Sequence, residues 1–312
     1  MKKVAFMFPG QGSQAVGMGK EFHDYYSDIK ELFQEANTAL DKDIARIMFD
    51  GPKEELTETE NAQPALLLTS IAIHTLLLKE EIQPVMTIGH SLGEYSALVA
   101  AGSIPLDRAL PLVAIRGKLM EEAFPEGQGT MAAVLGLSEE EIDKALQKVT
   151  GEIVDIANLN CPGQIVISGS VKGIEQATAL LKEHGAKRVL PLNVSGPFHS
   201  RLMKSANDQF GEYLNEVDIK NASIPVYANA SASPVRESEK IKELLLKQLY
   251  SPVRFEESIR HMIDAGVDAF VEVGNGKVLC GLLKKIDRSV KTFAVQDINS
   301  MNEFITWYKG DS

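Results

Sequence analysis

The chain has 312 residues, of which 44% are hydrophobic, so it is long enough to bury a sizeable core, either as one large domain with an insertion or as two domains. Its formal net charge of −11 argues against nucleic acid or an anionic membrane as the main partner, because both require clustered Lys and Arg. The two cysteines, Cys161 and Cys280, lie far apart without metal-ligand spacing, which indicates a reducing compartment such as the cytoplasm and neither a disulfide framework nor a metal site.

Residues 1–126 alternate short apolar strands with amphipathic helices, a pattern that predicts a mostly parallel sheet covered by helices. The most apolar helix, Pro64–Leu78, is interrupted by polar residues and falls short of the ~20 residues that a membrane span needs. We therefore expect a buried central helix and no membrane segment. The predicted elements are the strand Val4–Phe8, a helix near Tyr25–Leu40, the helix Pro64–Leu78, the strand Pro84–Gly89, a helix from Leu92 and the helix Asp107–Phe124.

Residues 127–197 follow a different, β-α-β-β-α-β order, which is ferredoxin-like. Ser138 and Glu141 form a predicted capping box at the start of the first helix of this segment. After Ser200 the first pattern returns, so we predict a discontinuous large subdomain, 1–126 and 198–312, with an inserted small subdomain, 127–197. The predicted elements after Ser200 are the helix Arg201–Val217, the strand Ile224–Ala228, the helix Glu239–Tyr250, the helix Phe255–Ala265, the strand Ala269–Val273, the helix Val278–Ile286 and the strand Thr292–Val295.

A serine stands between two glycines where the strand Pro84–Gly89 meets the following helix. At such a turn a serine is held in a strained conformation, with its hydroxyl exposed at the carboxyl edge of the sheet. The pattern predicts that Ser91 is a nucleophile and that the N–H of Leu92 donates to an oxyanion. The loop after the first strand should lie beside the nucleophile in a parallel sheet, so the N–H of Gln11 is the second predicted oxyanion donor.

A serine nucleophile needs a base, and His199 is our candidate among the six histidines. It follows a strand where the small subdomain ends, and this junction should face the cleft between subdomains; a surface-loop histidine is the alternative. His90, beside the nucleophile, is expected to shape the pocket. No Asp or Glu stands out between Ser91 and His199 as a third member, so a backbone carbonyl could accept the Nδ1 hydrogen instead.

Arg116 projects from the apolar stripe of the helix Asp107–Phe124. An unpaired buried guanidinium is expensive, so a carboxylate, internal or from a ligand, should pair with it. The helix pattern alone favours the internal salt bridge, although the planar fork of arginine suits a bidentate grip on a ligand carboxylate.

Seven motifs follow one another along nearly the whole chain: GQGSQ, Asn61-Ala62-Gln63-Pro64-Ala65, GHSLGEYSAL, Arg116, Asn160-Cys161-Pro162-Gly163-Gln164, GPFHS and Gln248-Leu249-Tyr250-Ser251-Pro252-Val253. In this order the chain resembles the malonyl-CoA:acyl carrier protein transacylases of bacterial fatty-acid synthesis. The resemblance implies an α/β-hydrolase-like core with a mostly parallel sheet and an inserted ferredoxin-like small subdomain. It also implies a ping-pong transfer, in which Ser91, deprotonated by His199, takes the malonyl group from malonyl-CoA and passes it to the phosphopantetheine thiol of acyl carrier protein.

The same resemblance implies further roles for individual residues. The backbone carbonyl of Gln248 would orient His199, which would explain the missing acid, and Arg116 would hold the malonyl carboxylate in place of a salt bridge. Gln11 and Leu92 would supply the oxyanion N–H groups. The other substrate-binding residues would be His90, Gln63, Met120, Phe198 and Asn160. No cofactor is implied beyond the CoA thioester substrate, and we expect a monomer.

Asn275 departs from the family pattern, which commonly has proline between the two glycines of this turn, and the change bears on turn rigidity rather than on chemistry. A serine hydrolase and a non-catalytic carrier-binding protein are the alternative classes. This acidic enzyme should meet an acidic carrier protein through local cations. The candidate cations are Arg201, Lys204, Lys284, Lys285 and Arg288.

Overall fold

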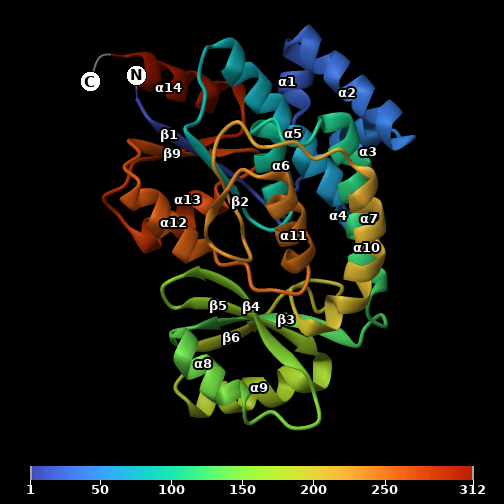
Figure 1. Cartoon of the computed structure of the whole chain (residues 1–312), viewed down its shortest axis with the longest axis vertical. Coiled ribbons are helices and arrows are strands. Elements are labelled where there is room, and N and C mark those ends of the chain that lie inside the picture. Colours follow the sequence, from blue (N-terminus) through green and yellow to red (C-terminus); the bar gives the residue numbers. More distant parts are fainter. Residues whose placement is uncertain (1, 311–312) are drawn as a thin grey trace.

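The computed structural model describes residues 2–310 and contains two β-sheets, one in each part of the molecule (Figure 1). The strands of the larger sheet are β1 (Val4–Phe8), β2 (Met86–Gly89), β7 (Val226–Tyr227), β8 (Pro234–Val235), β9 (Ala269–Val273) and β10 (Thr292–Val295). They lie in the order β10-β9-β1-β2-β7-β8, and every pair is parallel except β7 with β8 at the edge. The predicted mostly parallel sheet is therefore confirmed.

Helices cover both faces of this sheet. They are α1 (Lys20–Tyr25), α2 (Ser27–Leu40), α3 (Ile44–Asp50), α4 (Lys53–Thr57), α5 (Thr59–Lys79), α6 (Gly93–Ala100), α7 (Leu106–Glu122), α10 (Lys204–Glu216), α11 (Ser238–Gln248), α12 (Phe255–Asp264), α13 (Val278–Ile286) and α14 (Ile298–Lys309). The short η1 (Arg201–Met203) precedes α10. Of these, α1, α3, α4 and α14 were not predicted. The helix expected near Tyr25–Leu40 corresponds to α2, which begins at Ser27, after Tyr26 with its extended backbone.

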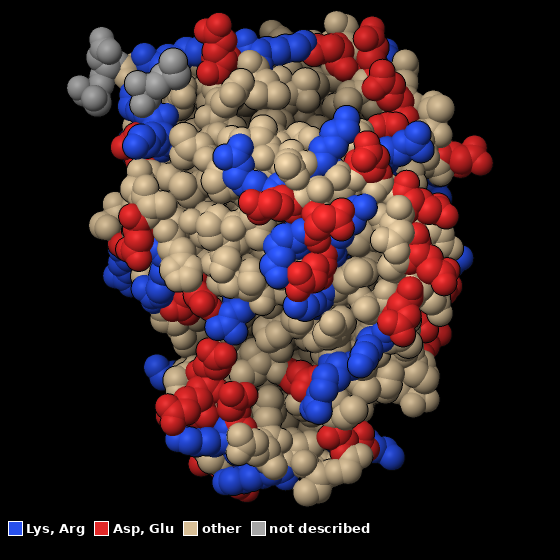
Figure 2. All heavy atoms as spheres, in the orientation of Figure 1, with Lys and Arg blue, Asp and Glu red and all other residues tan. Residues whose placement is uncertain are grey.

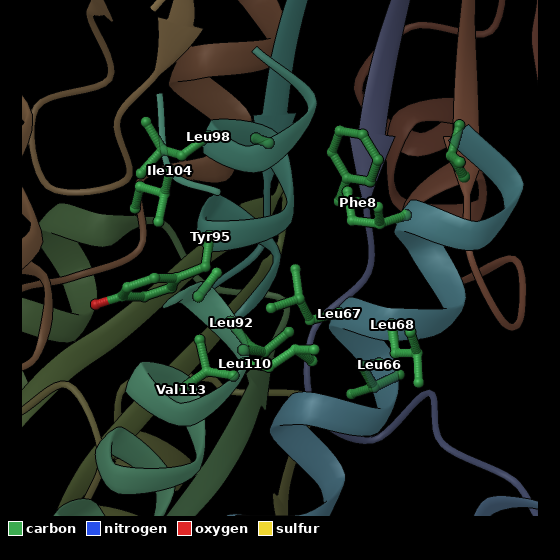
Figure 3. Close-up of a cluster of buried hydrophobic side chains, with 14 of the residues drawn as sticks. Phe8, Leu66, Leu67, Leu68, Leu92, Tyr95, Leu98, Ile104, Leu110 and Val113 are labelled. Atoms are coloured by element: carbon green, nitrogen blue, oxygen red, sulfur yellow. The ribbon is translucent and has the colours of Figure 1, made fainter. Parts of the chain in front are cut away.

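Strand β1 shows how the core is divided between the two faces of the sheet. Its residues Phe6 and Phe8 pack into the larger core, with side chains of α5, α6 and α7, while Ala5 and Met7 pack with side chains of α12 and α13. This division follows from the alternation of side chains along a strand. Figure 3 shows Phe8 with leucines of α5 on one side of this cluster and Leu92 and Tyr95 on the other side.

Helix α5 is longer than predicted. It has 21 residues and begins at Thr59, five residues before Pro64. The sequence pattern predicts the start at Pro64 because proline lacks the N–H that the helix interior needs and is therefore common at the first helical position. By length and composition α5 could cross a membrane, but 89% of its apolar window is buried inside the fold. Helix α5 is therefore the central core helix that the sequence predicted.

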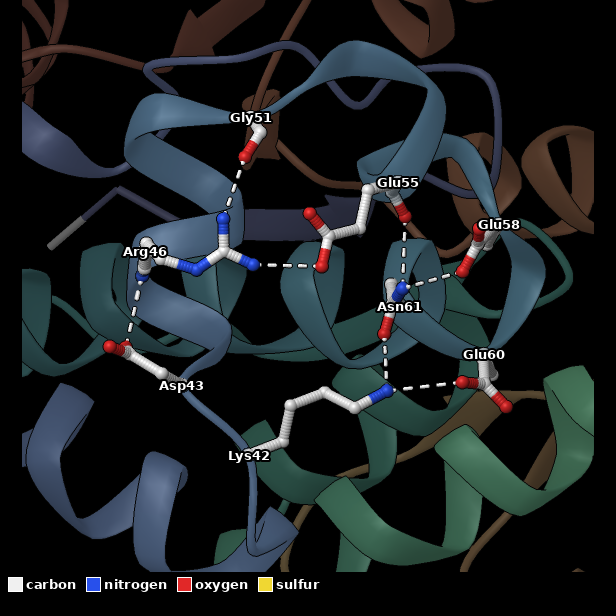
Figure 4. Close-up of polar contacts among 8 residues, drawn as sticks. All are labelled: Lys42, Asp43, Arg46, Gly51, Glu55, Glu58, Glu60 and Asn61. Atoms are coloured by element: carbon white, nitrogen blue, oxygen red, sulfur yellow. Dashed lines mark hydrogen bonds and ion pairs between the residues drawn. The ribbon is translucent and has the colours of Figure 1, made fainter.

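A cluster of polar contacts holds the first turn of α5 (Figure 4). The buried side chain of Asn61 donates from Nδ2 to the carbonyl oxygen of Glu55 at 2.9 Å and to Oε2 of Glu58 at 3.1 Å, and its Oδ1 accepts from Nζ of Lys42 at 2.8 Å. Arg46 of α3 donates from Nη2 to Oε1 of Glu55 at 2.8 Å. These partners come from several short elements, so helix propensity alone does not predict the turn.

The second sheet is antiparallel and carries its own two helices, which lie on the side facing away from the large part (Figure 1). Its elements are β3 (Gly129–Leu135), α8 (Glu139–Leu146), β4 (Val154–Cys161), β5 (Gln164–Ser170), α9 (Val171–Glu183) and β6 (Arg188–Pro191). The strand order is β4-β5-β3-β6, so the predicted β-α-β-β-α-β arrangement is confirmed. The capping box of Ser138 and Glu141 is present as predicted.

Both faces of the second sheet are buried. Ala132 and Val134 of β3 pack with side chains of α8 and α9, whereas Met131 and Ala133 belong to the core of the large part. The two parts are also joined through the main chain of Val253, after α11, which exchanges hydrogen bonds with β4. The division into 1–126 with 198–312 and 127–197 stays a prediction, but these contacts pack one face of the small sheet against the large part.

Candidate active site

Ser91 lies at the turn between β2 and α6 and has a left-handed backbone, with φ of 52°. The flanking glycines allow the strand and helix to approach closely: a Cβ on Gly89 would overlap the main chain of Gly93, and a Cβ on Gly93 would overlap the carbonyl of Phe8 in β1. A left-handed serine costs backbone energy, and such strain is typical of a nucleophile at a strand-to-helix turn. The local pattern therefore places the hydroxyl of Ser91 above the sheet edge.

His199 follows β6 and also has a left-handed backbone, with φ of 59°. Its Nε2 lies 2.8 Å from Oγ of Ser91, and its Nδ1 lies 2.8 Å from the carbonyl oxygen of Gln248 at the end of α11. A carbonyl oxygen can only accept, so Nδ1 carries the hydrogen and Nε2 is free to accept the proton of Ser91. Burial and the charge of Arg116 lower the pKa of His199 to about 3, which keeps the imidazole neutral at physiological pH.

Arg116, on α7, is fully buried and bonds to neutral oxygens. Its Nη1 donates to Oε1 of Gln63 at 2.8 Å, and its Nη2 donates to Oε1 of Gln248 at 2.9 Å and to Oγ of Ser91 at 3.1 Å. The guanidinium also lies over the ring of Tyr95, 5.3 Å from the centroid. Among residues 2–310 it forms no ion pair, so the internal salt bridge favoured by the helix pattern is wrong. Amide oxygens have taken the place of the carboxylate.

Two residues at this site were missed in the sequence. Asn229, after β7, accepts at Oδ1 from the N–H of Ser91 at 2.8 Å and donates from Nδ2 to the carbonyl oxygen of Gly89 at 2.7 Å. Glu94, in the first turn of α6, is buried and accepts at Oε2 from the N–H of Asn229 and from Nε2 of Gln248. Burial raises the pKa of Glu94 to about 7, against the opposite effect of these hydrogen bonds. A polar residue at the carboxyl end of the strand next to β2 could have pointed to Asn229.

His90 links the nucleophile turn to the small sheet. Its Nε2 lies 2.8 Å from Oδ1 of Asn160 on β4, and its ring lies 5.6 Å from that of Phe255 on α12. Burial lowers the pKa of His90, so the ring is neutral and Nε2 can donate to the amide oxygen. The two residues together form part of the wall between the two parts of the molecule.

A cleft of about 270 Å³ opens above Ser91. The large part contributes the loop after β1 and the start of α13, and the small part contributes β4, β5 and the segment after β6. The lining includes these predicted site residues: Gln11, His90, Ser91, Met120, Asn160, Phe198 and His199. Gln63, Arg116 and Gln248 are buried beneath it, and Leu92 is buried as the residue that caps the start of α6. The structure thus brings all the predicted site residues to one place.

Two further contacts concern the loop after β1 and the turn before α13. Nε2 of Gln11 donates to Oγ1 of Thr59 at 3.3 Å, which connects the loop to the first turn of α5. Nδ2 of Asn275 donates to the carbonyl oxygen of Ser13 at 2.6 Å. The turn at Asn275 is distant from Ser91 in sequence but borders the cleft in space, where Val278 forms part of the lining.

Comparison with known proteins agrees with this geometry. An acyl transferase domain model matches residues 5–303. The chain is 54% identical over 299 residues to the malonyl CoA-acyl carrier protein transacylase of Bacillus subtilis, with 95% of this chain and 94% of that protein covered. It is also similar to the solved structure of an acyl carrier protein S-malonyltransferase from Vibrio cholerae, with a TM-score of 0.95, 45% identity, and 97% and 99% of the two chains covered. A malonyl-transacylase in complex with its type II PKS acyl-carrier protein has a TM-score of 0.94 and 41% identity, with 97% of this chain and 99% of that chain covered.

Proposed function

This chain belongs to the acyl transferase domain family, among its malonyl-CoA:acyl carrier protein transacylases, and we propose that Ser91 carries the malonyl group between the two thiols. One observation carries the proposal: Oγ of Ser91 lies within hydrogen-bond distance of both a neutral base, His199, and a buried cation, Arg116. The serine and histidine suit acyl transfer, and the cation suits an acyl group that bears a carboxylate.

In the first half-reaction, Oγ of Ser91 gives its proton to Nε2 of His199 and forms a bond to the thioester carbon of malonyl-CoA. The C–S bond then breaks, and the CoA sulfur takes the proton from Nε2, which leaves a malonyl ester on Ser91. The carbonyl of Gln248 holds Nδ1–H throughout, so the imidazolium is stabilised without a carboxylate partner. The N–H groups of Gln11 and Leu92 would donate to the oxyanion, which is supported by their places beside the cleft and at the start of α6.

Arg116 would hold the malonyl carboxylate. Its Nη2 already reaches Oγ of Ser91, so a carboxylate two bonds from the acyl carbon falls within reach of the guanidinium. His90, Met120, Phe198 and Asn160 line the cleft, and Gln63 accepts from Arg116 beneath it; these residues would bind the rest of the acyl group and the thiol arm. No cofactor takes part in this scheme.

In the second half-reaction, the phosphopantetheine thiol of acyl carrier protein gives its proton to Nε2 of His199 and forms a bond to the malonyl carbon. The ester C–O bond breaks, and Oγ of Ser91 takes the proton back. The carrier would dock through exposed cations beside the cleft. Acidic and basic side chains are interspersed over the face in Figure 2, so local placement rather than net charge must guide the carrier.

Of the candidate docking cations, Arg201 is already paired. It donates to the carboxylate of Asp155 from Nη2 at 2.9 Å and from Nε at 3.0 Å, which ties the loop after His199 to β4. Lys285 donates to Oε1 of Gln164, a residue of the cleft lining, at 3.2 Å. We therefore favour the α13 side of the cleft for the carrier. We further propose that the protein acts as a cytoplasmic monomer.

Mass spectrometry after brief incubation with malonyl-CoA tests the nucleophile, substrate and reaction class together. The expected result is one added malonyl group on Ser91, which disappears when acyl carrier protein bearing phosphopantetheine is added and reappears on the carrier. The Ser91→Ala variant should take up no malonyl group. Release of free malonate without acylation of the carrier would instead identify a serine hydrolase, and failure to label Ser91 would favour a non-catalytic carrier-binding protein.

A further inference from the structure

Glu94 is a buried acid beside the reacting groups that the proposed transfer does not use. It lies three residues after Ser91, and its side chain is directed into the interior between α6 and α11. One oxygen, Oε2, accepts from two donors, Nε2 of Gln248 at 2.7 Å and the N–H of Asn229 at 3.0 Å. A buried carboxyl is costly unless it is hydrogen-bonded, and both residues that satisfy Glu94 also bond to the main chain of Ser91.

The side chain of Gln248 has only one orientation that satisfies its neighbours. Its Oε1 faces Nη2 of Arg116, which can only donate, at 2.9 Å. Its Nε2 faces three acceptors: Oε2 of Glu94 at 2.7 Å, the carbonyl oxygen of Ser91 at 3.0 Å and, at the longer distance of 3.4 Å, Oδ1 of Asn229. Rotation of the amide by half a turn would set donor against donor at Arg116 and acceptor against acceptor at Glu94 and Ser91. The carboxyl of Glu94, which accepts the shortest hydrogen bond of Nε2, therefore helps to fix where Oε1 of Gln248 lies.

The position of Oε1 in turn fixes the guanidinium. Nη2 of Arg116 donates both to this oxygen and to Oγ of Ser91, so a displaced amide would move the nitrogen that reaches the nucleophile. Glu94 and Arg116 are separated by one amide instead of forming a direct ion pair. A direct ion pair would occupy guanidinium N–H groups that a substrate carboxylate needs.

We propose that Glu94 is a positioning residue that acts through the amide of Gln248 to set Arg116 for the malonyl carboxylate. The proposal rests on the proposed function and adds a selectivity role that is separate from the Ser91–His199 pair. That pair has one support that does not involve the Glu94 side chain, the main-chain carbonyl of Gln248 for His199. The side chain of Asn229, which accepts from the N–H of Ser91, is anchored by its Nδ2 on Gly89, while its main-chain N–H donates to Glu94.

Two substitutions of Glu94 separate hydrogen bonding from bulk. Glu94→Leu keeps the volume but removes the acceptor, whereas Glu94→Gln keeps an amide oxygen that can accept from the same two donors. Ser96→Ala is the matched control, because Ser96 lies on the same helix and its buried hydroxyl has no hydrogen-bond partner among the described residues. Gln248→Leu provides a second route, since it removes the amide and retains the main-chain carbonyl.

The measurements are kcat/KM for acylation by malonyl-CoA and by acetyl-CoA, with the rate at which an uncharged fluorophosphonate labels Ser91. For Glu94→Leu and Gln248→Leu, the malonyl-to-acetyl ratio should fall at least about tenfold. For Glu94→Leu, which lies outside the reacting groups, the labelling rate should change less than about threefold. Glu94→Gln should stay within about threefold of the parent in both readouts, and Ser96→Ala should match the parent.

Three results would overturn the proposal. The first is an unchanged malonyl-to-acetyl ratio in Gln248→Leu or in a Glu94→Leu protein that still labels. The second is a Glu94→Gln protein as unselective as Glu94→Leu. The third is a parent protein that forms no malonyl-serine, which alone would also contradict the proposed function; the first two leave that function intact.

Discussion

Replacement of Arg116 by alanine should abolish most of the preference for malonyl-CoA over acetyl-CoA. In the structure its Nη1 and Nη2 face three neutral oxygens, from Gln63, Gln248 and Ser91. A substrate carboxylate would form two charge-assisted hydrogen bonds with this guanidinium, each worth about 1.5–3 kcal/mol. Loss of both hydrogen bonds removes about 3–6 kcal/mol of binding free energy for the malonyl carboxylate. Each 1.4 kcal/mol corresponds to a tenfold change in rate, so kcat/KM for malonyl-CoA should fall by about 10² to 10⁴.

Acetyl-CoA should respond in the opposite sense. In the parent, an acetyl group leaves the buried guanidinium of Arg116 without a carboxylate, a cost that the alanine variant no longer bears. The kcat/KM for acetyl-CoA should therefore stay level or rise. Arg116→Lys should recover part of the malonyl rate relative to Arg116→Ala, because an ammonium keeps the charge but cannot form the bidentate pair with the carboxylate. Arg116→Met fills the space and controls for the cavity that alanine leaves.

The assay follows the mass of the acyl-enzyme after rapid mixing with each thioester, and thermal unfolding checks that each variant is folded. The ratio of the two kcat/KM values is the deciding quantity, because a general loss of active protein cancels from it. If the ratio stays parental while both rates fall together, Arg116 is a structural residue and the assignment of the carboxylate to it is refuted.

Further predictions concern the base, the acid stability, the nucleophile turn and the carrier. His199→Ala should slow acylation by roughly a hundredfold or more, and an unchanged rate in rapid mixing would point to another base. The pKa values of His74 and His199 are about 4 and about 3 in the folded protein, whereas an exposed histidine of the unfolded chain has a pKa of 6.5. Below pH 6.5 the unfolded chain therefore binds protons at these two histidines that the folded chain does not. The free energy of unfolding should thus decrease as the pH is lowered below 6.5, by up to about 1.4 kcal/mol per pH unit for each histidine. Between pH 7 and 4.5 the raised pKa of Glu94 has the opposite effect and offsets the contribution of one histidine. Urea unfolding at several pH values measures this slope, which should be smaller in His74→Phe; equal slopes would contradict it. Gly93→Ala should lower the melting temperature, because its Cβ would overlap the carbonyl of Phe8, and a parental value would show that the turn relaxes. Transfer to the carrier should slow with added salt, since a field from exposed cations is screened within about 10 Å at 0.1 M; salt-independent turnover would remove the α13 side as the docking face.

Several expectations failed for one shared reason: the sequence does not show which distant groups meet. Arg116 was expected to prefer a salt bridge, but the amides of Gln63 and Gln248, 53 and 132 residues away, receive its hydrogen bonds. The first turn of α5 was missed because Asn61 is held by Lys42 and other side chains of neighbouring short elements. In each case a tertiary contact, absent from the local pattern, decided the structure.

The sequence by itself determined what depends on near neighbours. The turn around Ser91, the strands β9 and β10 and the capping box at Ser138 follow from local backbone conformation and side-chain periodicity, so they could be read directly. The tertiary structure alone decided that Glu94 and Gln248, 154 residues apart, share a hydrogen bond beneath the nucleophile. The physical reason is that a buried polar group takes whichever partner the packing brings to it, and that packing depends on the whole chain.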